Sequence, residues 1–302
     1  MIVFAPTSIP LARNIAKRLG AKFCRIEINY FPDNEVYIRF KENPKNKDII
    51  IVHSLSENPN EKIIELLFSS LTAKELGAKR ILGVIPYLAY MRQDKRFKKG
   101  ECISAKILPK LIENSGIDAV FTLNPHLHRI KSLTEIFSIP VFELSCGKEI
   151  GEYIKKNFSG DWVLVGPDTE SRNLIRNISE TSGLDYIVLR KKRIGPKKVK
   201  ILPSKIRISK RNAIIIDDMT STGETIIETI KELKKHGFKK FFCIVIHLIS
   251  EDFLIKVKKY CKAISTNSVQ TKVSKIDVSE VFSYAIKRYL TQKPIREIDE
   301  LF

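Results

Sequence analysis

The sequence predicts an α/β protein of two similar domains, each built on a doubly wound, mainly parallel sheet. Apolar strand-like runs alternate with segments of helical spacing of about 10–15 residues, which is typical of parallel sheets with helices on both faces. The alternation runs through the first half of the chain and starts again after Ile139-Pro140. We therefore expect an N-terminal α/β domain over residues 1–141 and a C-terminal α/β domain over 142–302.

The first half of the chain supplies the elements of the first expected sheet. A strand at 1–6 precedes a helix from Ile9 to Leu19, with Gly20 as the residue that ends it. Two further strands flank a Pro-Asp-Asn turn, which favours a hairpin. The expected elements are, in order, strands at 24–31, 35–40 and 48–54, a helix at 61–77, a strand at 81–88, a helix at 104–116 and a strand at 119–124.

The second half repeats this pattern with breaker-free helices between buried strands. No low-complexity stretch or flexible linker separates the two halves. The expected elements are strands at 161–168, 185–190, 213–218 and 241–247 and helices at 174–183 and 225–236.

Composition limits the class of protein. The chain has 302 residues, 43% of them hydrophobic and 29% charged, which indicates a globular protein with a large core. Its five cysteines are scattered and form no C-x-x-C pair, so we expect reduced thiols, mostly in the core, and a cytoplasmic location. The first residues, MIVFAPTSIP, lack the pattern of a signal peptide, and no apolar run is long enough to predict a membrane span.

The net charge of +19 favours polyanionic partners such as nucleotides, sugar phosphates or nucleic acids. Residues 190–211 hold 11 basic residues and no acid. This segment leaves one expected strand and returns to another, so we interpret its first residues as lying near a ligand and the rest as a flap.

The most informative segment is AIIIDDMTSTGET, residues 213–225. A buried strand ends in two carboxylates and a hydroxyl-rich turn, and a helix follows. The first turn of that helix presents unpaired N–H groups and the positive end of its dipole, which predicts an anion site. Gly223 allows an oxyanion to approach the backbone closely. Asp217 and Asp218 suit sugar hydroxyls or a metal ion; the alternative is a capped turn whose acids serve the helix.

Four more segments follow expected strands, where open parallel sheets bind ligands. FPDNE, residues 31–35, combines an aromatic ring with two acids; a solvated turn is the alternative. Residues 86–106, PYLAYMRQDKRFKKGECISAK, carry an Arg-Gln-Asp run suited to a base and a polyphosphate; a basic surface loop is the alternative. The other two are TLNPHLH, residues 122–128, and VGPD, residues 165–168.

Each of these last two segments also has a structural alternative. His126 and His128 lack the neighbours of a zinc site, so a single His near a magnesium-nucleotide is one interpretation and a structural role is the other. Asp168 suits Mg²⁺ or a sugar, or caps a helix.

Taken together and in this order, the segments resemble the ribose-phosphate diphosphokinase (phosphoribosyl-pyrophosphate synthetase) family, whose domains have the type I phosphoribosyltransferase fold. The matching pieces are FPDNE, the RQDKRF…ISAK segment, TLNPH, GPD, RKKR at 190–193 and IIIDDMTSTGET. The resemblance implies transfer of the diphosphoryl group of ATP to the C1 hydroxyl of ribose 5-phosphate. It further implies Mg²⁺ as cofactor and a homo-oligomer, at least a dimer, in which subunits share the ATP site; no membrane or nucleic-acid partner is expected.

The resemblance also assigns roles to residues. It implies that Lys191 and Arg193 are catalytic and that His126 and Asp168 serve the metal. The implied ATP contacts are Phe31, Asp33, Asn34, Glu35, Arg92 and Gln93. The implied ribose 5-phosphate contacts are Asp217 and Asp218 for the hydroxyls and Ser221, Thr222, Gly223, Glu224 and Thr225 for the phosphate.

The chain departs from the family pattern at a few positions, which is typical of archaeal members. Asn124, Arg190 and Ser221 stand where an acid is frequent, and Thr169-Glu170 replaces small residues. Three other functions share features with this chain: a base phosphoribosyltransferase, which would consume the diphosphate product, a non-catalytic regulatory homologue, and a nucleic-acid-binding regulator using the basic charge.

Overall fold

The computed structural model describes residues 1–193, 199–202, 212–220 and 222–292, with the backbone alone for 190–193 and 199–202. The chain forms two compact units. The first contains residues 1–144, 267–270 and the segment from 277 onward, and the second contains residues 145–266 and 271–276. The sequence-based division assigned all of 142–302 to one domain, whereas the contacts return the C-terminal segment to the first unit.

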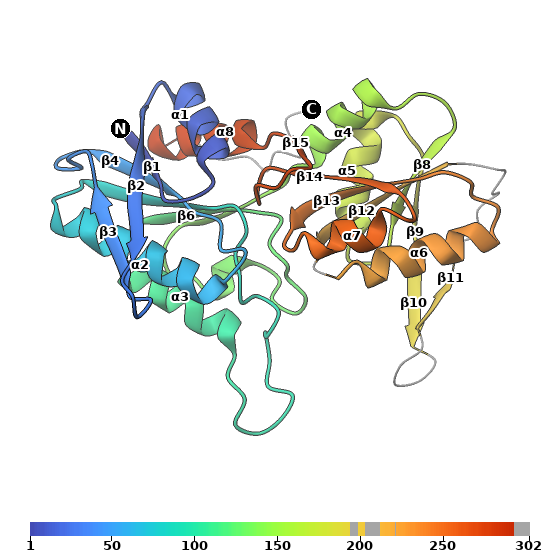
Figure 1. Ribbon diagram of the computed structural model, residues 1–302, viewed down its shortest axis with the longest axis horizontal. Coiled ribbons are helices and arrows are strands. Elements are labelled where there is room, and N and C mark those ends of the chain that lie inside the picture. Colours follow the sequence, from blue (N-terminus) through green and yellow to red (C-terminus); the bar gives the residue numbers. More distant parts are fainter. Residues whose placement is uncertain (194–198, 203–211, 221, 293–302) are drawn as a thin grey trace. The chain divides into compact units, whose positions relative to one another are not determined.

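The first unit is built on a seven-stranded sheet in the order β3-β2-β1-β4-β5-β6-β7, parallel except for the β2–β3 hairpin (Figure 1). Its elements are β1 (Ile2–Ala5), α1 (Ile9–Leu19), β2 (Lys22–Tyr30), β3 (Val36–Phe40), β4 (Asp48–Val52), α2 (Pro59–Glu75), β5 (Arg80–Ile85), α3 (Ser104–Asn114), β6 (Ala119–Leu123), the 3₁₀ turn η1 (Leu133–Glu135), β7 (Val141–Leu144) and α8 (Ser279–Leu290).

The continuous apolar runs become the buried strands of this sheet. Every residue of β1 and of β6 is buried, as expected for parallel strands covered on both faces. The helix predicted at 9–19 is α1, and Gly20 ends it with φ 64°, donating its N–H to the Lys17 carbonyl. The long segment between β5 and α3 projects away from the sheet (Figure 1).

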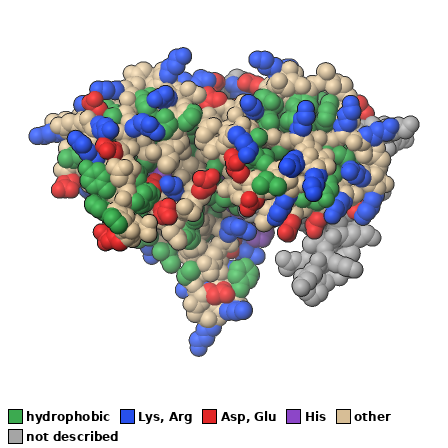
Figure 2. Space-filling model, viewed as in Figure 1, with side chains coloured by type: hydrophobic (Ala, Val, Ile, Leu, Met, Phe, Trp, Pro, Cys, Tyr) green, Lys and Arg blue, Asp and Glu red, His purple; other side chains and the backbone are tan. Residues whose placement is uncertain are grey.

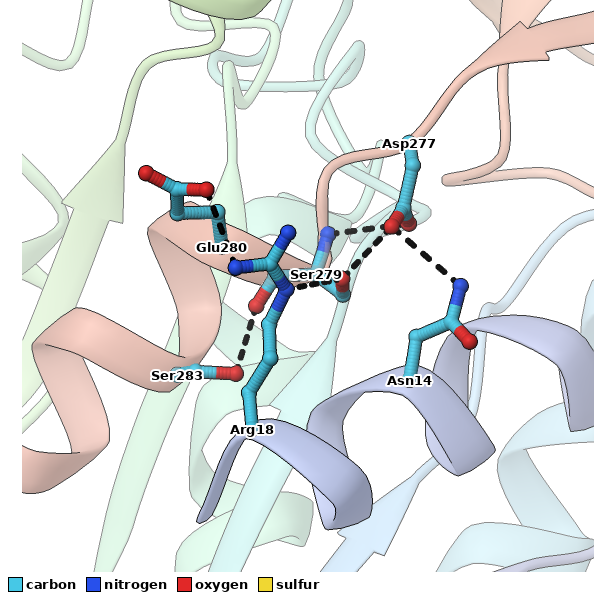
Figure 3. A network of polar contacts seen from close by, with 6 residues as sticks. All are labelled: Asn14, Arg18, Asp277, Ser279, Glu280 and Ser283. Atoms are coloured by element: carbon cyan, nitrogen blue, oxygen red, sulfur yellow. Dashed lines mark hydrogen bonds and ion pairs between the residues drawn. The ribbon is translucent and has the colours of Figure 1, made fainter.

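Helix α8 was not among the predicted elements, and the sequence-based division placed its residues in the second domain. Its buried residues include Val281, Phe282 and Ile286, and it packs against α1 near the start of the chain. Polar contacts join the two helices: Arg18 bonds Ser279 at 3.0 Å and pairs with Glu280 at 2.9 Å (Figure 3). At the edge of the same network, Asn14 and Ser279 both donate to the Asp277 carboxylate (Figure 3). Because α8 covers one face of α1, it belongs to the first core.

The second unit is built on a six-stranded sheet in the order β15-β14-β13-β12-β8-β9, in which every pairing is parallel. Its elements are α4 (Gly147–Asn157), β8 (Trp162–Gly166), α5 (Arg172–Ser182), β9 (Tyr186–Val188), β12 (Asn212–Thr220), α6 (Glu224–Lys235), β13 (Phe241–Leu248), α7 (Asp252–Val257), β14 (Lys262–Thr266) and β15 (Ser274–Ile276). A separate antiparallel hairpin, β10 (Arg190–Arg193) with β11 (Val199–Leu202), follows β9. The predicted fold class, two mainly parallel doubly wound sheets, is confirmed.

The surface and the thiols agree with the composition. On the face seen in Figure 2, Lys and Arg side chains are scattered over both units, with acidic side chains between them.

Three of the five cysteines are buried, Cys146, Cys243 and Cys261, and all five are free thiols. Burial raises the pKa of Cys261 to about 12, so this thiol stays protonated. Within the described ranges, no helix is both long and apolar enough to cross a membrane.

Candidate active site

In the second unit, acidic residues gather where two neighbouring strands end. Strands β8 and β12 pair in parallel, with Val165 opposite Ile215. Asp168 lies three residues beyond the first of these partners and Asp218 three residues beyond the second. Asp168, Asp217 and Asp218 are all half-buried. Parallel strands end at the same sheet edge, so these carboxylates lie near the edge where open parallel sheets bind ligands.

The turn after β12 leads directly into the N-terminus of α6. Thr220 is the last residue of the strand and Glu224 the first of the helix. No described side chain caps this helix, so the N–H groups of its first turn point toward the turn. Together with the helix dipole they favour an anion there. Thr222 and Glu224 are exposed and Thr225 is half-buried, so the turn is open to a ligand.

Gly223 is required at this turn for two physical reasons. Its φ of 76° is a left-handed conformation that side chains with a Cβ adopt only with strain. A Cβ on this residue would also lie 2.6 Å from Cδ2 of Phe253, a fully buried ring of α7. The glycine therefore lets the turn sit close against the core.

Asp168 closes the turn before α5 and is not the N-cap of that helix, a position that Ser171 occupies. Its Oδ1 accepts backbone N–H groups from Glu170 at 3.2 Å and Ser171 at 3.4 Å. Ser171 Oγ donates to the Asp168 carbonyl at 2.6 Å. Behind it, a Cβ on Gly166 would lie 2.2 Å from Ser171 Oγ, so a larger residue at this strand end would displace the Ser171 hydroxyl from this turn. These bonds fix the carboxylate at the end of β8.

In the first unit, residues 31–35 form the exposed tip of the β2–β3 hairpin. Phe31 N–H donates to Glu35 O at 2.8 Å, and Asn34 N–H to Phe31 O at 2.9 Å. Asn34 has φ 70°, which closes the tight turn. Phe31 is 51% exposed and packs edge-on against Tyr37 at 6.2 Å between ring centroids. The exposed Phe31 ring is thus suited to stacking on a base, and two acids lie beside it in solvent.

The segment carrying Arg92 and Gln93 is tied to the segment carrying His126. Between them, buried Asp94 accepts the Arg129 guanidinium at 2.9 Å and the Arg129 backbone N–H at 3.0 Å. Burial alone would raise the pKa of Asp94, but these bonds from Arg129 prevail and hold it below its usual range. The two segments follow the paired strands β5 and β6, so the ion pair fixes both loops at one sheet edge.

Helix α2 holds the base of the hairpin tip through a buried carboxylate. Glu65, 1% exposed, accepts the phenol of Tyr30, the residue just before Phe31. It also accepts Lys62 Nζ at 2.8 Å and lies 3.0 Å from Nε2 of His53. Burial would raise the pKa of Glu65, but interactions with His53, Lys62 and Tyr30 lower it to about 2.

The histidine of this cluster is neutral. Complete burial lowers the pKa of His53 in spite of the nearby Glu65 carboxylate. The Thr7 hydroxyl lies 2.8 Å from Nδ1 of this ring, and Nε2 lies 3.0 Å from a Glu65 oxygen without the geometry of a hydrogen bond. The cluster therefore places one carboxylate beside one ammonium group, one phenol and a neutral imidazole.

The same helix also holds the second loop. The Tyr90 phenol bonds the Asn60 side chain, and the Tyr90 carbonyl accepts Ser104 Oγ at 3.0 Å. Tyr90 has φ 64°, a strained conformation for a ring-bearing residue, two positions before Arg92. Two tyrosines, each just ahead of a predicted ATP-contact segment, are thus anchored on α2. We refer to the Tyr30–Glu65 and Tyr90–Asn60 bonds as the α2 anchors.

The remaining predicted site residues fall in different parts of the chain. His126 is half-buried after β6 in the first unit, whereas Asp168 belongs to the second. Lys191 and Arg193 lie in β10, opposite Ile201 and Val199 of β11. Ser221 lies outside the described residues. Among the residues that are described, no group of three or more His, Cys, Asp or Glu side chains is close enough to hold a metal ion by itself.

Sequence reasoning missed the α2 anchors and Arg129. The one available signal was Glu65, a charged residue in helical phase with buried Leu66, Ser69 and Ala73. A carboxylate on the apolar side of a helix is costly unless it is paired, so it indicates a buried polar contact. The partner, Tyr30, lies 35 residues away and has no signature of its own.

Comparisons with known proteins agree with this geometry. The protein-family model for the N-terminal domain of ribose phosphate pyrophosphokinase matches residues 1–116, and the family model for the phosphoribosyl transferase domain matches residues 132–282. The ribose-phosphate pyrophosphokinase of Methanothermobacter thermautotrophicus is 34% identical over 95% of this chain and its own full length. That of Methanopyrus kandleri is 30% identical over 95% of this chain and 99% of its own.

A solved structure shares the fold. The phosphoribosylpyrophosphate synthetase of Mycobacterium smegmatis superposes with a TM-score of 0.82 at 22% identity, over 96% of this chain and 99% of that one. The near-complete coverage shows that both units and their order are common to the two proteins. With two family models and relatives above 30% identity over nearly the whole length, the chain belongs to the ribose-phosphate pyrophosphokinase family.

Proposed function

We propose that the chain transfers the diphosphoryl group of ATP to the C1 hydroxyl of ribose 5-phosphate, making 5-phosphoribosyl 1-diphosphate and AMP for nucleotide biosynthesis. One observation carries the proposal: Asp217 and Asp218 lie near the end of β12, whose last residue is Thr220, and a short turn leads from there to the N-terminus of α6 at Glu224, which no described side chain caps. A pentose 5-phosphate needs both halves of this arrangement, because carboxylates accept its hydroxyls and helix N–H groups bind its phosphate.

In this proposal the sugar phosphate lies along the β12–α6 turn. Asp217 and Asp218 accept hydrogen bonds from the ribose hydroxyls. The residues that cradle the 5-phosphate are Ser221, Thr222, Gly223, Glu224 and Thr225, the glycine and glutamate through their backbone N–H groups. The exposure of Thr222 and Glu224 and the forced position of Gly223 support this assignment.

ATP is assigned to the loops of the first unit. Phe31 stacks on the adenine ring, while Asp33, Asn34 and Glu35 contact the nucleotide from the hairpin tip. Arg92 and Gln93 contact the polyphosphate and the base. The exposed Phe31 ring and the Asp94–Arg129 pair, which fixes the loop of Arg92, support these roles.

The reaction requires alignment and charge neutralisation rather than an enzyme nucleophile. The C1 hydroxyl of ribose 5-phosphate attacks the β-phosphorus of ATP, the bond to the α-phosphate oxygen breaks, and AMP leaves. Lys191 and Arg193 stabilise the charge on the transferring group. Asp168 would offer Mg²⁺ a hard oxygen ligand and His126 would contact the ion directly or through one of its water ligands, and the ion would neutralise phosphate oxygens of ATP.

Three further parts complete the proposal, and family membership supports them. The enzyme is a homo-oligomer, at least a dimer, and the hairpin tip at 31–35 contacts ATP bound largely to a neighbouring subunit. It acts in the cytoplasm. Residues 1–141 supply the ATP contacts, and residues 142–302 supply the ribose-phosphate turn and the catalytic pair.

One assay tests the function directly. The purified protein is mixed with ATP, Mg²⁺ and ribose 5-phosphate, and the nucleotide products are separated. We expect AMP and a pyrophosphorylated pentose in equal amounts. ADP as the nucleotide product would instead identify an ordinary sugar kinase, and pyrophosphate release that depends on an added nucleobase would identify a base phosphoribosyltransferase.

A further inference from the structure

The second unit contains an open pocket of about 580 Å³ at the amino-terminal edge of its sheet. It is lined where strands begin: Trp162 is the first residue of β8, Phe241 of β13 and Lys262 of β14. We call it the edge pocket. Its volume lies in the range of about 300–1,000 Å³ that small-molecule sites occupy.

The edge pocket is separate from the ribose-phosphate turn. Trp162 pairs with Asn212, the first residue of β12, whereas the turn follows Thr220, the last. A strand rises roughly 3.3 Å per residue, so these eight steps separate the two places by about 26 Å. Open parallel sheets bind their substrates at the carboxyl edge. A ligand at the opposite edge would therefore be a second ligand.

Four lysines converge on the edge pocket: Lys234, Lys239, Lys240 and Lys262. All are exposed, and none forms an ion pair with a carboxylate within the described part of the chain. No Asp or Glu lines the pocket. Elsewhere in this unit, Lys235 pairs with Glu232 at 2.8 Å and Lys272 with Glu251 at 2.7 Å. Unpaired like charges around one hollow create a local positive potential, which attracts an anion.

The floor of the edge pocket is aromatic. Phe158 packs edge-on against Trp162 at 5.1 Å and against Phe242 at 4.8 Å between centroids. Tyr153, Phe241 and Tyr260 complete the aromatic lining; Phe241 is buried, and the other five rings are half-buried. Partly exposed ring faces are suited to stacking on a planar aromatic ligand.

We infer that the edge pocket binds a nucleoside phosphate, with the base on the aromatic floor and the phosphates between the lysines. The combination decides the ligand class. Inorganic phosphate or a sugar phosphate would use the lysines and leave the rings unused, and an uncharged aromatic molecule would leave four ammonium groups uncompensated. This inference is independent of the proposed reaction, because the pocket contains none of the residues assigned to it.

The chain supplies its own probe, since Trp162 is its single tryptophan. Tryptophan fluorescence is followed while ADP is added to the full-length protein without Mg²⁺ or ribose 5-phosphate. Inorganic phosphate and ribose 5-phosphate serve as parallel titrations. We expect saturable quenching with ADP and at least about tenfold weaker effects with the two ligands that lack a base, because they lose the stacking contribution.

A pair of variants assigns the signal to the pocket. Lys239→Gln/Lys240→Gln removes two lining charges and is expected to weaken ADP quenching about tenfold or more. Lys258→Gln/Lys259→Gln removes the same charge from two exposed lysines outside the lining and is expected to leave the quenching curve in place. Both variants should retain the wild-type kcat, which also shows that they are folded.

Several results would overturn the inference. These are the absence of quenching at millimolar ADP, equal quenching by phosphate, or equal losses in the two double variants. A fluorescence change that follows protein concentration rather than ADP would mean that the pocket is an interface between copies of the chain. Tighter binding of a single-stranded oligonucleotide than of ADP would mean a nucleic-acid site.

Discussion

The candidate site of the second unit lies where a strand ends and a helix begins, whereas that of the first unit lies on loops held by side chains. In the second unit, backbone geometry places Asp217, Asp218 and the N–H groups of α6 with little help. In the first, Phe31 and Arg92 depend on bonds from Tyr30 and Tyr90 to helix α2. Backbone-built sites are specified by short sequence motifs, while loop sites depend on partners distant in sequence.

The largest expected effect belongs to the β10 residues of the second unit. Lys191→Ala should lower kcat by about 10²–10³-fold, the loss typical of removing one transition-state donor, with a smaller change in the KM for ATP. Lys192→Ala, which removes the same charge from the adjacent position, is the control. Near-normal turnover of the Lys191 variant would remove this residue from the mechanism.

The next effect concerns the buried carboxylate of Glu65 in the first unit and the dependence of stability on pH. Glu65 has a pKa lowered from 4.5 to about 2, so its contribution to stability is present above pH 4.5 and is lost as pH falls toward 2. At about 1.4 kcal/mol per pKa unit this contribution is up to about 3 kcal/mol.

Denaturant unfolding at pH 6 and near pH 2.5 measures it. The free energy of unfolding of the wild type should clearly exceed that of Glu65→Gln at pH 6, and this difference should shrink at the lower pH. Glu61→Gln changes an exposed carboxylate of the same helix, and its free energy of unfolding should differ little from that of the wild type at either pH. A gap between wild type and Glu65→Gln that is the same at both pH values would contradict the ionised, buried carboxylate.

A smaller effect is expected from the phosphate cradle. Thr225→Val should raise the KM for ribose 5-phosphate about 10- to 100-fold, since a hydrogen bond to a charged group contributes about 1.5–3 kcal/mol. The KM for ATP should stay near its wild-type value. Thr229→Val, one turn later in α6, is a matched control, because the buried Thr229 hydroxyl has no hydrogen-bond partner among the described residues. An effect of Thr225→Val confined to ATP would refute the assignment of this turn.

The smallest effect sharpens the role of the α2 anchors. Tyr30→Phe removes one hydrogen bond to Glu65 and should raise the KM for ATP about three- to tenfold through a looser hairpin tip, with the KM for ribose 5-phosphate unchanged. Tyr37→Phe alters an exposed tyrosine of the same hairpin and should have no effect. If Tyr30→Phe raised both KM values alike, the anchor would serve general stability rather than the ATP loop.

The sequence predicted the β12–α6 turn well because one continuous segment contains the strand, the acids, Gly223 and the helix. It predicted the alternation of strands and helices for the same reason, since each element is encoded locally. It could not predict that Asp94 would be buried against Arg129, or that Glu65 would meet Tyr30, because those contacts form only after distant strands pair. The assignment of α8 failed on the same ground: its apolar stripe does not say which core it covers.

The return of α8 to the first unit has a consequence for synthesis of the chain. Helix α1 (Ile9–Leu19) is made long before α8 (Ser279–Leu290), the helix that covers it, so the first unit stays unfinished until α8 has been made. The apolar face shared by α1 and α8 remains a point of exposure for the nascent chain. A ribosome-stalled fragment ending near residue 266 should therefore bind chaperones or be degraded, even though the first sheet is complete.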